Sequence, residues 1–400
     1  MDFESWWLIL FPLLFGLGWV AARLDFRQML SETRALPDSY FKGLNFLLNE
    51  QPDRAIDAFI EVAKLDPETT ELHFALGSLF RRRGEMERAI RVHQSLLSRS
   101  DLPVREREHA LHEIAQDYLK AGMLDRAELA YKELSHTRYE ESSSRALVRI
   151  YESEHDWPRA IEAVTRLGKL TGESVAQLVH YHCEMAQARL TQQPTDVLAA
   201  KDALDLARQG LDAAGDSTHA SHARVLMLAA AIAHGEGDGA LERQHLRQVM
   251  KDAPEYVGLV ADELQANFAA TDESSALLRL LLTQYEHYPS LDLFDVVFRL
   301  INSQEGSQAA WAFAGQALTK NPSLLGFEHA LRVSAKETET SVSLAPIDTA
   351  LLQKLISRHT QRLERYGCRV CGFQAKAFYW QCPGCHGWET YPPRRLEELQ

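Results

Sequence analysis

The sequence predicts an all-α protein: a superhelical solenoid of paired helices with one N-terminal transmembrane helix and a small C-terminal metal ribbon. An uncharged apolar run near the start, a repeated pattern in the middle and four clustered cysteines near the end predict these three parts. The 400 residues accordingly divide into an anchor at 1–22, a juxtamembrane segment at 23–35, a helical array at 36–333, a linker and helix at 334–365, and a ribbon at 366–393.

The anchor is predicted from residues 5–22, which carry no charged side chain. At 1.5 Å per residue, a helix of about eighteen residues just crosses a hydrocarbon core roughly 30 Å thick. Trp6 and Trp7 at one edge and Trp19 at the other match the aromatic belts of a spanning helix. A cleaved signal peptide would need a basic segment in front of the apolar run, where this chain is acidic. A buried core helix is the other alternative.

Basic residues set the expected orientation of the anchor. Arg23, Arg27, Arg34 and Lys42 follow the apolar run, and none precedes it. The positive-inside rule therefore places the bulk of the chain in the cytoplasm. Because that compartment is reducing, disulfides are not expected there.

The helical array is predicted from a repeat of about 34 residues. Gly43 and Gly77 are 34 residues apart, and so are Ala55 and Ala89. Further positions in the same register are Phe46, Phe59, Phe80, His93, Ala115, Tyr118, Gly122, Ala127, Tyr131, Tyr151, Ala160 and Val164. This pattern resembles the tetratricopeptide repeat, in which a small residue lets two helices touch and an aromatic residue fills the gap to the next repeat. A generic helical bundle is the alternative.

The repeat signal weakens farther along the chain. Pro254, Pro289 and Pro322 keep spacings of 35 and 33 residues, which extends the array to about residue 333 with an irregular section near 172–222. The polar segment 336–346 predicts a linker into a last helix at 348–365.

Four cysteines predict the metal ribbon: Cys368 and Cys371 form one CxxC pair, and Cys382 and Cys385 form the second. Each CxxC turn can aim two thiolates at one point, so two turns complete a tetrahedral S4 site. Two disulfides or a redox CxxC are the alternatives, and a redox motif would be single. Since protein fills every ligand position, the metal is expected to be structural, with zinc favoured over iron.

Signatures of catalysis are absent from the sequence, which contains no P-loop, GxGxxG, HExxH or GxSxG motif. The cluster His180, His182, Cys183 and Glu184 does not form a second metal site by spacing, because residues one or two apart on a helix do not converge. Cys183 is expected to be a small packing residue. A net charge of −13 argues against nucleic acid as a partner.

The register also predicts a binding groove on the concave face of the array. First-helix positions pointing away from the second helix are Phe74, Arg81, Arg82, His112, Gln116, Lys120, Arg145 and Arg149. This cationic set in an acidic protein would suit an acidic or carboxylate-bearing peptide of a partner. An ordinary solvated face is an equal alternative.

The order of anchor, repeats and CxxC…CPxC ribbon, together with YHCEMA at 181–186, resembles the lipopolysaccharide assembly protein B family of Gram-negative bacteria. The resemblance implies a non-enzymatic adaptor in the inner membrane that works with other envelope-biogenesis proteins. It implies that a membrane AAA+ protease is a partner and that the committed lipid A deacetylase is the client whose turnover is promoted. A scaffold for lipopolysaccharide synthesis or transport proteins without a proteolytic role, and a redox or metal sensor, are the other functions considered.

Overall fold

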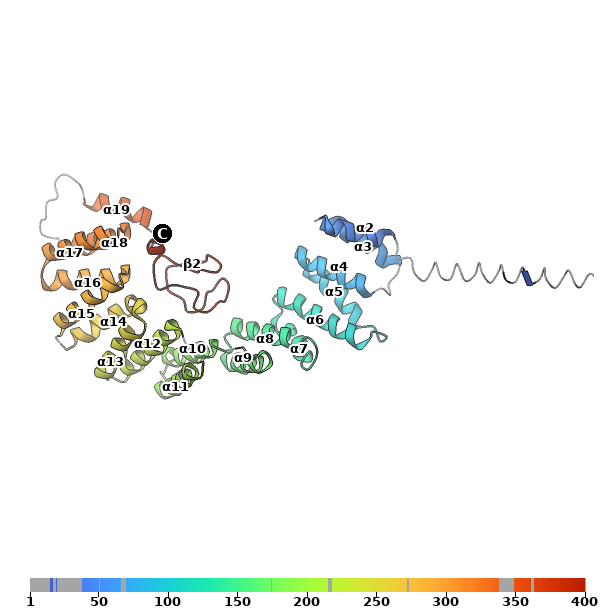
Figure 1. Cartoon of the computed structure of the whole chain (residues 1–400), viewed down its shortest axis with the longest axis horizontal. Helices are drawn as coiled ribbons and strands as arrows, with labels where there is room; N and C mark the ends of the chain where they lie inside the picture. The colour runs from blue at the N-terminus through green and yellow to red at the C-terminus, as the bar shows by residue number, and fades with distance from the viewer. Residues whose placement is uncertain are drawn as a thin grey trace, which may run out of the picture. The chain divides into compact units, whose positions relative to one another are not determined.

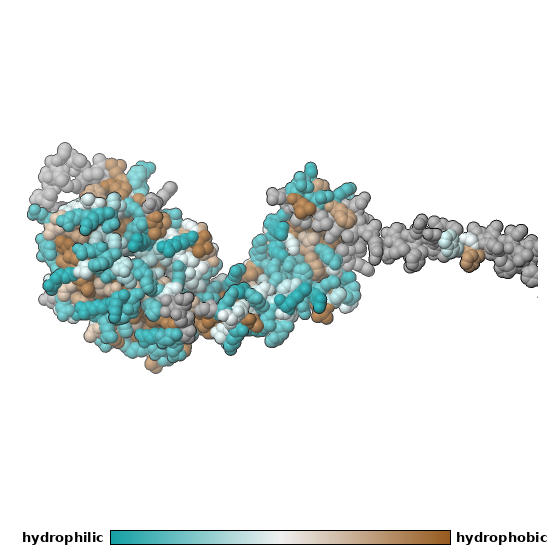
Figure 2. Space-filling view, in the orientation of Figure 1, coloured by the Kyte–Doolittle hydropathy of each residue, from teal (hydrophilic) through white to brown (hydrophobic). Residues whose placement is uncertain are grey.

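The computed structural model describes residues 15–16, 19, 38–49, 51–65, 70–173, 175–214, 218–271, 273–337, 349–360 and 363–399. The chain falls into two compact units, Met1–Ala146 and Leu147–Gln400, and the boundary lies within α8 (Glu140–Glu154). On the face shown in Figure 2, hydrophilic residues predominate and hydrophobic ones are scattered, which agrees with the high charge of the sequence.

The first unit consists of helix hairpins: α2 (Asp38–Leu48) with α3 (Pro52–Leu65), α4 (Thr70–Arg83) with α5 (Met86–Leu97), and α6 (Val104–Lys120) with α7 (Leu124–Glu133). Ala55, Ala89 and Ala127 of the predicted register are fully buried. A Cβ atom on Gly43 would lie 2.5 Å from the ring of Phe59, and one on Gly77 would lie 2.3 Å from the ring of His93. The predicted close approach at these glycines is therefore confirmed.

Gly77→Ala should destabilise the array, because the new methyl group would overlap the imidazole of His93. That ring is fully buried and hydrogen-bonded to Asp117, so it has little room to move. We expect a loss of about 1–3 kcal/mol in the free energy of unfolding, measured by chemical denaturation. Gly315→Ala is the matched control, since a Cβ there meets nothing within 4 Å and should be neutral or slightly stabilising. Equal stability of the two variants would contradict the packing described.

The second unit continues the hairpins and ends in the ribbon. Its helices are α9 (Trp157–Thr171), α10 (Gln177–Thr191), α11 (Val197–Ala214), α12 (His219–Gly235), α13 (Gly239–Asp252), η1 (Pro254–Val260), α14 (Ala261–Ala269), α15 (Ser274–His287), α16 (Leu291–Gln304), α17 (Ser307–Lys320), α18 (Leu324–Glu337) and α19 (Thr349–Thr360). The ribbon contains β1 (Tyr366–Gly367) and β2 (Gln374–Ala375), paired antiparallel, followed by η2 (Leu396–Leu399). Within this unit, α10 to α18 curve around the ribbon (Figure 1).

The section at 172–222 contains regular helices. The helices α10 and α11 form a hairpin there, with Ala200 and Ala207 fully buried between them. The repeat spacing is nevertheless irregular, as predicted, because α10 begins at Gln177 and α12 at His219, 42 residues later (219 − 177) instead of about 34. The predicted prolines mark helix starts, since Pro254 opens η1 while Pro289 and Pro322 stand two residues before α16 and α18.

Element ends differ from the predicted boundaries near the linker. The helix α18 runs to Glu337, beyond the predicted end of the array at 333, and α19 covers Thr349–Thr360 rather than 348–365. The predicted anchor at 1–22 and juxtamembrane segment at 23–35 lie outside the described residues, apart from positions 15, 16 and 19. Within the part of the chain that the structure describes, no helix has the length and apolarity needed to cross a membrane.

Candidate functional site

The four ribbon cysteines come together as the sequence predicted. Their Sγ atoms all lie within 4.8 Å of one another, with Cys368 and Cys385 at 3.7 Å and Cys371 and Cys382 at 3.6 Å. A thiolate tetrahedron with metal–sulfur bonds of about 2.3 Å has edges of about 3.8 Å, whereas a disulfide needs about 2 Å. The geometry of the sulfur atoms therefore fits a tetrahedral metal ion and not two disulfides.

Two similar turns present these thiolates. In the first turn, Gly372 has φ +74° and its N–H donates to the carbonyl of Cys368. In the second, His386 has φ +56° and its N–H donates to the carbonyl of Cys382. A glycine such as Gly372 is the residue that sequence reasoning would expect in the left-handed region, whereas His386 leaves no compositional signal there.

Backbone N–H groups face the sulfur atoms, as expected for thiolates that hold a cation. Val370 N–H donates to Cys368 Sγ at 3.4 Å, and Gly384 N–H donates to Cys382 Sγ at 3.3 Å. Cys368, Cys371, Cys382 and Cys385 would hold one ion, and zinc and iron both suit four thiolates. The ion would supply a cross-link between the two turns, because no ligand position is left for a substrate.

The ribbon docks on the array through Trp388. Its indole stacks on the imidazole of His180 in α10, with ring centroids 4.8 Å apart and an angle of 8° between the planes. The indole N–H donates to Glu152 of α8 at 2.9 Å, and the same carboxylate accepts a hydrogen bond from Tyr181 at 2.7 Å. Glu152 is buried, so its two donors replace the water that it loses on docking.

Glu389 adds hydrogen bonds to the array next to this aromatic contact. Its carboxylate accepts hydrogen bonds from His180 Nε2–H at 2.8 Å, Ser221 Oγ–H at 2.6 Å and Thr218 Oγ1–H at 2.7 Å. Burial opposes ionisation of Glu389, but these three donors outweigh it and lower its pKa to about 2. Burial also lowers the pKa of His180, whose Nδ1 accepts a hydrogen bond from Arg224. The imidazole is therefore neutral, with its proton on Nε2.

A second aromatic group extends the docking surface toward η1. Trp380 stacks on Tyr256, with ring centroids 5.6 Å apart and an angle of 14°, and Phe378 meets both rings edge-on. The guanidinium of Arg224 lies 5.5 Å from the ring centroids of both Trp380 and Trp388. Both ribbon tryptophans thus face the array.

The C-terminal tail, residues 394–399, adds further contacts between the ribbon and the array. Glu397 accepts hydrogen bonds from the N–H groups of Leu324 and Leu325 at the start of α18, and Glu398 accepts one from Leu291 at the start of α16. Arg395 pairs with Asp292 at 2.7 Å. Carboxylates are favoured at helix N-termini because the free N–H groups and the helix dipole are positive there.

Glu389→Ala should weaken the docking of the ribbon, because the buried donors of His180 and Ser221 would lose their hydrogen-bond acceptor. We expect the free energy of unfolding to fall by about 2–5 kcal/mol, measured by unfolding in guanidinium chloride and followed by tryptophan fluorescence. A carboxyl pKa of about 2 in the folded protein, against an ordinary 4.5, means that this contribution is present above pH 4.5 and is lost as the pH falls toward 2. Lys376→Ala is the control, because the side chain of Lys376 is exposed. An unfolding midpoint of Glu389→Ala equal to that of the control would show that the hydrogen bonds of Glu389 do not hold the ribbon.

The residues of the predicted cationic groove are not all available to a ligand. Arg81 pairs with Glu113 at 2.5 Å and with Asp117 at 2.8 Å, so it bridges α4 and α6 inside the first unit. His112 is buried, stacks on Tyr139 at 4.3 Å and is hydrogen-bonded by Ser142.

Other members of the predicted set keep solvent contact. Arg82 and Lys120 are exposed in the first unit, whereas Arg149 is exposed in the second. Gln116 and Arg145 are half-buried, and Arg145 also pairs with Glu141. Phe74, likewise half-buried, stacks on His109. The cationic groove therefore stays a prediction, and fewer of its basic side chains are available to a ligand than the sequence indicated.

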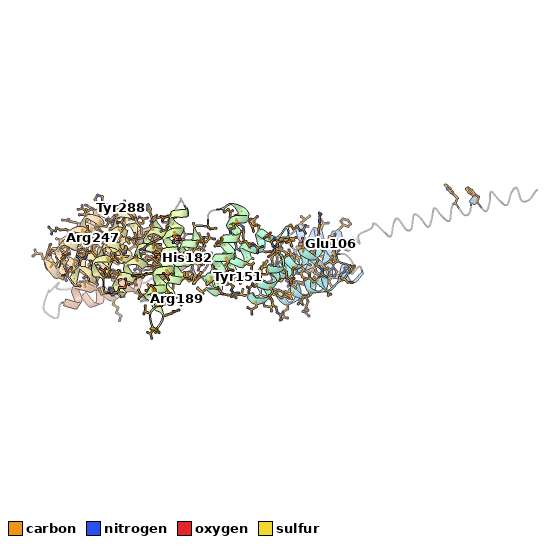
Figure 3. The ribbon with its side chains drawn as sticks, turned by 90° about the horizontal axis from the view of Figure 1, so that it is seen from below. Glu106, Tyr151, His182, Arg189, Arg247 and Tyr288 are labelled. Carbon is orange, nitrogen blue, oxygen red and sulfur yellow. The ribbon has the colours of Figure 1, made fainter. Side chains whose placement is uncertain are left out.

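The histidine cluster on α10 serves packing and docking. Cys183 is fully buried in an apolar cluster, as expected, and burial raises the pKa of its thiol to about 12. His180 contacts the ribbon, a role that sequence reasoning missed although YHCEMA at 181–186 had drawn attention to its neighbours. His182 lies on the same helix (Figure 3). In the described part of the chain, the ribbon cysteines are the one cluster of candidate metal ligands.

The array and the ribbon docked on it define the class of the protein: a helical-repeat protein that carries a four-cysteine metal-binding ribbon. Family models agree: one for the tetratricopeptide repeat matches residues 72–108, and one described as a rubredoxin metal binding domain matches residues 366–393. Lipopolysaccharide assembly protein B of Escherichia coli (strain K12) is 30% identical over 97% of each chain, and that of Haemophilus influenzae is 26% identical over 98% of each. The chain belongs to the lipopolysaccharide assembly protein B family.

Proposed function

We propose that the chain is an adaptor in the inner membrane that limits lipopolysaccharide synthesis, by presenting the committed lipid A deacetylase to the membrane AAA+ protease. The observation that carries this proposal is membership of the lipopolysaccharide assembly protein B family along 97% of the chain. The docked ribbon supports a binding role, because its candidate metal ligands leave no open position for catalysis.

The anchor has a physical role in this function. The uncharged segment 5–22 would span the membrane, with the array and the ribbon on the cytoplasmic side. A client held by the array beside a membrane protease meets it at roughly millimolar local concentration, so modest affinities suffice. The chain then accelerates proteolysis without any catalytic group of its own.

The ribbon would act by fixing the shape of the second unit. It contacts α8, α10 and α12 through Trp388 and Glu389, and α16 and α18 through its C-terminal tail. Since these helices come from separate repeats, the metal-bound ribbon ties several repeats together where each would otherwise contact only its neighbours.

Cross-linking in intact cells tests the proposed function. The chain is kept at native abundance, cross-linked, purified from membranes, and its partners are identified by mass spectrometry. Recovery of the membrane protease and the lipid A deacetylase is the expected result. Recovery of lipopolysaccharide synthesis or transport enzymes without the protease would favour the second candidate, an assembly scaffold, which the names of the relatives also suit.

A further inference from the structure

A cavity of about 860 Å³ opens beside the docked ribbon in the second unit. Its walls come mainly from α12, the start of α13 and α14, and Trp380 of the ribbon also lines it. Its volume lies within the range of ligand pockets, about 300–1,000 Å³. The cavity adjoins the docking surface, because Trp380 and Arg224 line the cavity and also take part in seating the ribbon.

The groove exists because the regular stacking of first helices is interrupted at this point. The helix α10 packs on α12, α14 packs on α16, and α16 packs on α18, whereas α12 and α14 make at most marginal contact. The short helix η1 intervenes and packs against both of them. The exposed side chains of Ala231 on α12 and Ala266 on α14 are too small to close the gap.

The charges that line the groove are unbalanced. Two guanidinium groups reach it, but Arg224 is paired with Glu184, and Arg243 with Glu273. Three carboxylates also line it: Glu242, Asp262 and Glu263.

These carboxylates differ in their partners. Glu242 is buried, accepts a hydrogen bond from Asn267 and lies 3.2 Å from His234 Nδ1, and Asp262 pairs with Arg299. Among the described residues, Glu263 has no ion-pair partner. Desolvation by its surroundings, and after it the neighbouring Asp262 and Glu242, raise the pKa of Glu263, although its side chain keeps solvent contact.

We propose that this groove binds a peptide segment of a partner protein in which one basic side chain stands among apolar ones. The alanines and Met227 offer apolar contact, and a lysine or arginine would pair with Glu263. An acidic segment would bring like charges together and is disfavoured. This ligand is opposite in charge to the one expected for the cationic groove predicted from the sequence.

A random dodecapeptide display library tests this directly. It is selected on the full-length, metal-loaded protein in detergent and counter-selected on Ala266→Trp, whose indole should fill the groove. Peptides that bind the wild type but not Ala266→Trp should carry a basic residue flanked by apolar ones. Metal content and unfolding midpoint serve as folding controls, and Ala231→Trp blocks the groove from the opposite helix.

The charge test uses Glu263→Lys, an exposed position where folding should be unaffected. Selected peptides should bind this variant at least tenfold more weakly, and copies with glutamate in place of the basic residue should regain affinity for it. The absence of groove-dependent peptides, or equal binding by wild type and Glu263→Lys, would overturn the proposal. Binding here needs neither the protease nor the deacetylase, so either result leaves the proposed function to its own test.

Discussion

Cys368→Ser combined with Cys371→Ser should remove the metal, unfold the ribbon and abolish client turnover. The ribbon is held by two-residue strands, and Tyr366 and Tyr391 are its large buried side chains, so it cannot fold on apolar contact alone. A structural four-ligand ion supplies on the order of 10 kcal/mol of folding free energy in such sites. Its loss would also release the contacts of Trp388 and Glu389 with the array.

Metal analysis, tryptophan fluorescence and amide hydrogen exchange measure this result. We expect no bound metal, a changed emission spectrum, and faster exchange in α10 and α12, where His180 and Ser221 lose their hydrogen bonds to Glu389. Cys183→Ala is the control, because this buried cysteine lies in an apolar cluster apart from the metal ligands, and the variant should keep one metal ion. Normal turnover of the deacetylase with the metal gone would show that the ribbon is dispensable.

A chain that starts at Arg23 should be soluble, folded and metal-bound, yet weak or inactive in cells. Removing residues 1–22 leaves the helices from α2 onward and the ribbon in place but removes the tether, and with it the roughly millimolar local concentration. The measurement compares metal content in vitro with deacetylase half-life in cells at native abundance. An unrelated single span of the same orientation is the matched control and should restore activity. Full activity of the untethered chain would rule out tethering as the mechanism.

Local sequence patterns predicted those parts of the fold that depend on local contacts. Gly43 and Gly77 predicted the close approach of paired helices, and the CxxC spacing predicted which sulfur atoms meet. The pairing of Arg81 with Asp117 was also within reach, because the two residues are 36 positions apart, about one repeat. Counting charges without applying the repeat period made Arg81 look free for a ligand.

Contacts between distant segments could not be predicted from the sequence. Glu389 meets His180 across 209 residues, and Glu397 meets the start of α18 across 73, with no periodicity that would connect them. The groove beside α12 was missed for a different reason. Pro254 was recognised as a repeat marker, but the sequence does not show that the helix it opens, η1, holds α12 and α14 apart.

The half-life of the lipid A deacetylase, measured after translation is blocked, tests the adaptor function most directly. Cells that carry the full chain at native abundance are compared with cells that lack it, each with and without the membrane protease. We predict a half-life several-fold longer when the chain is absent, and no effect of the chain once the protease is depleted. An unchanged half-life in cells without the chain would contradict the adaptor function.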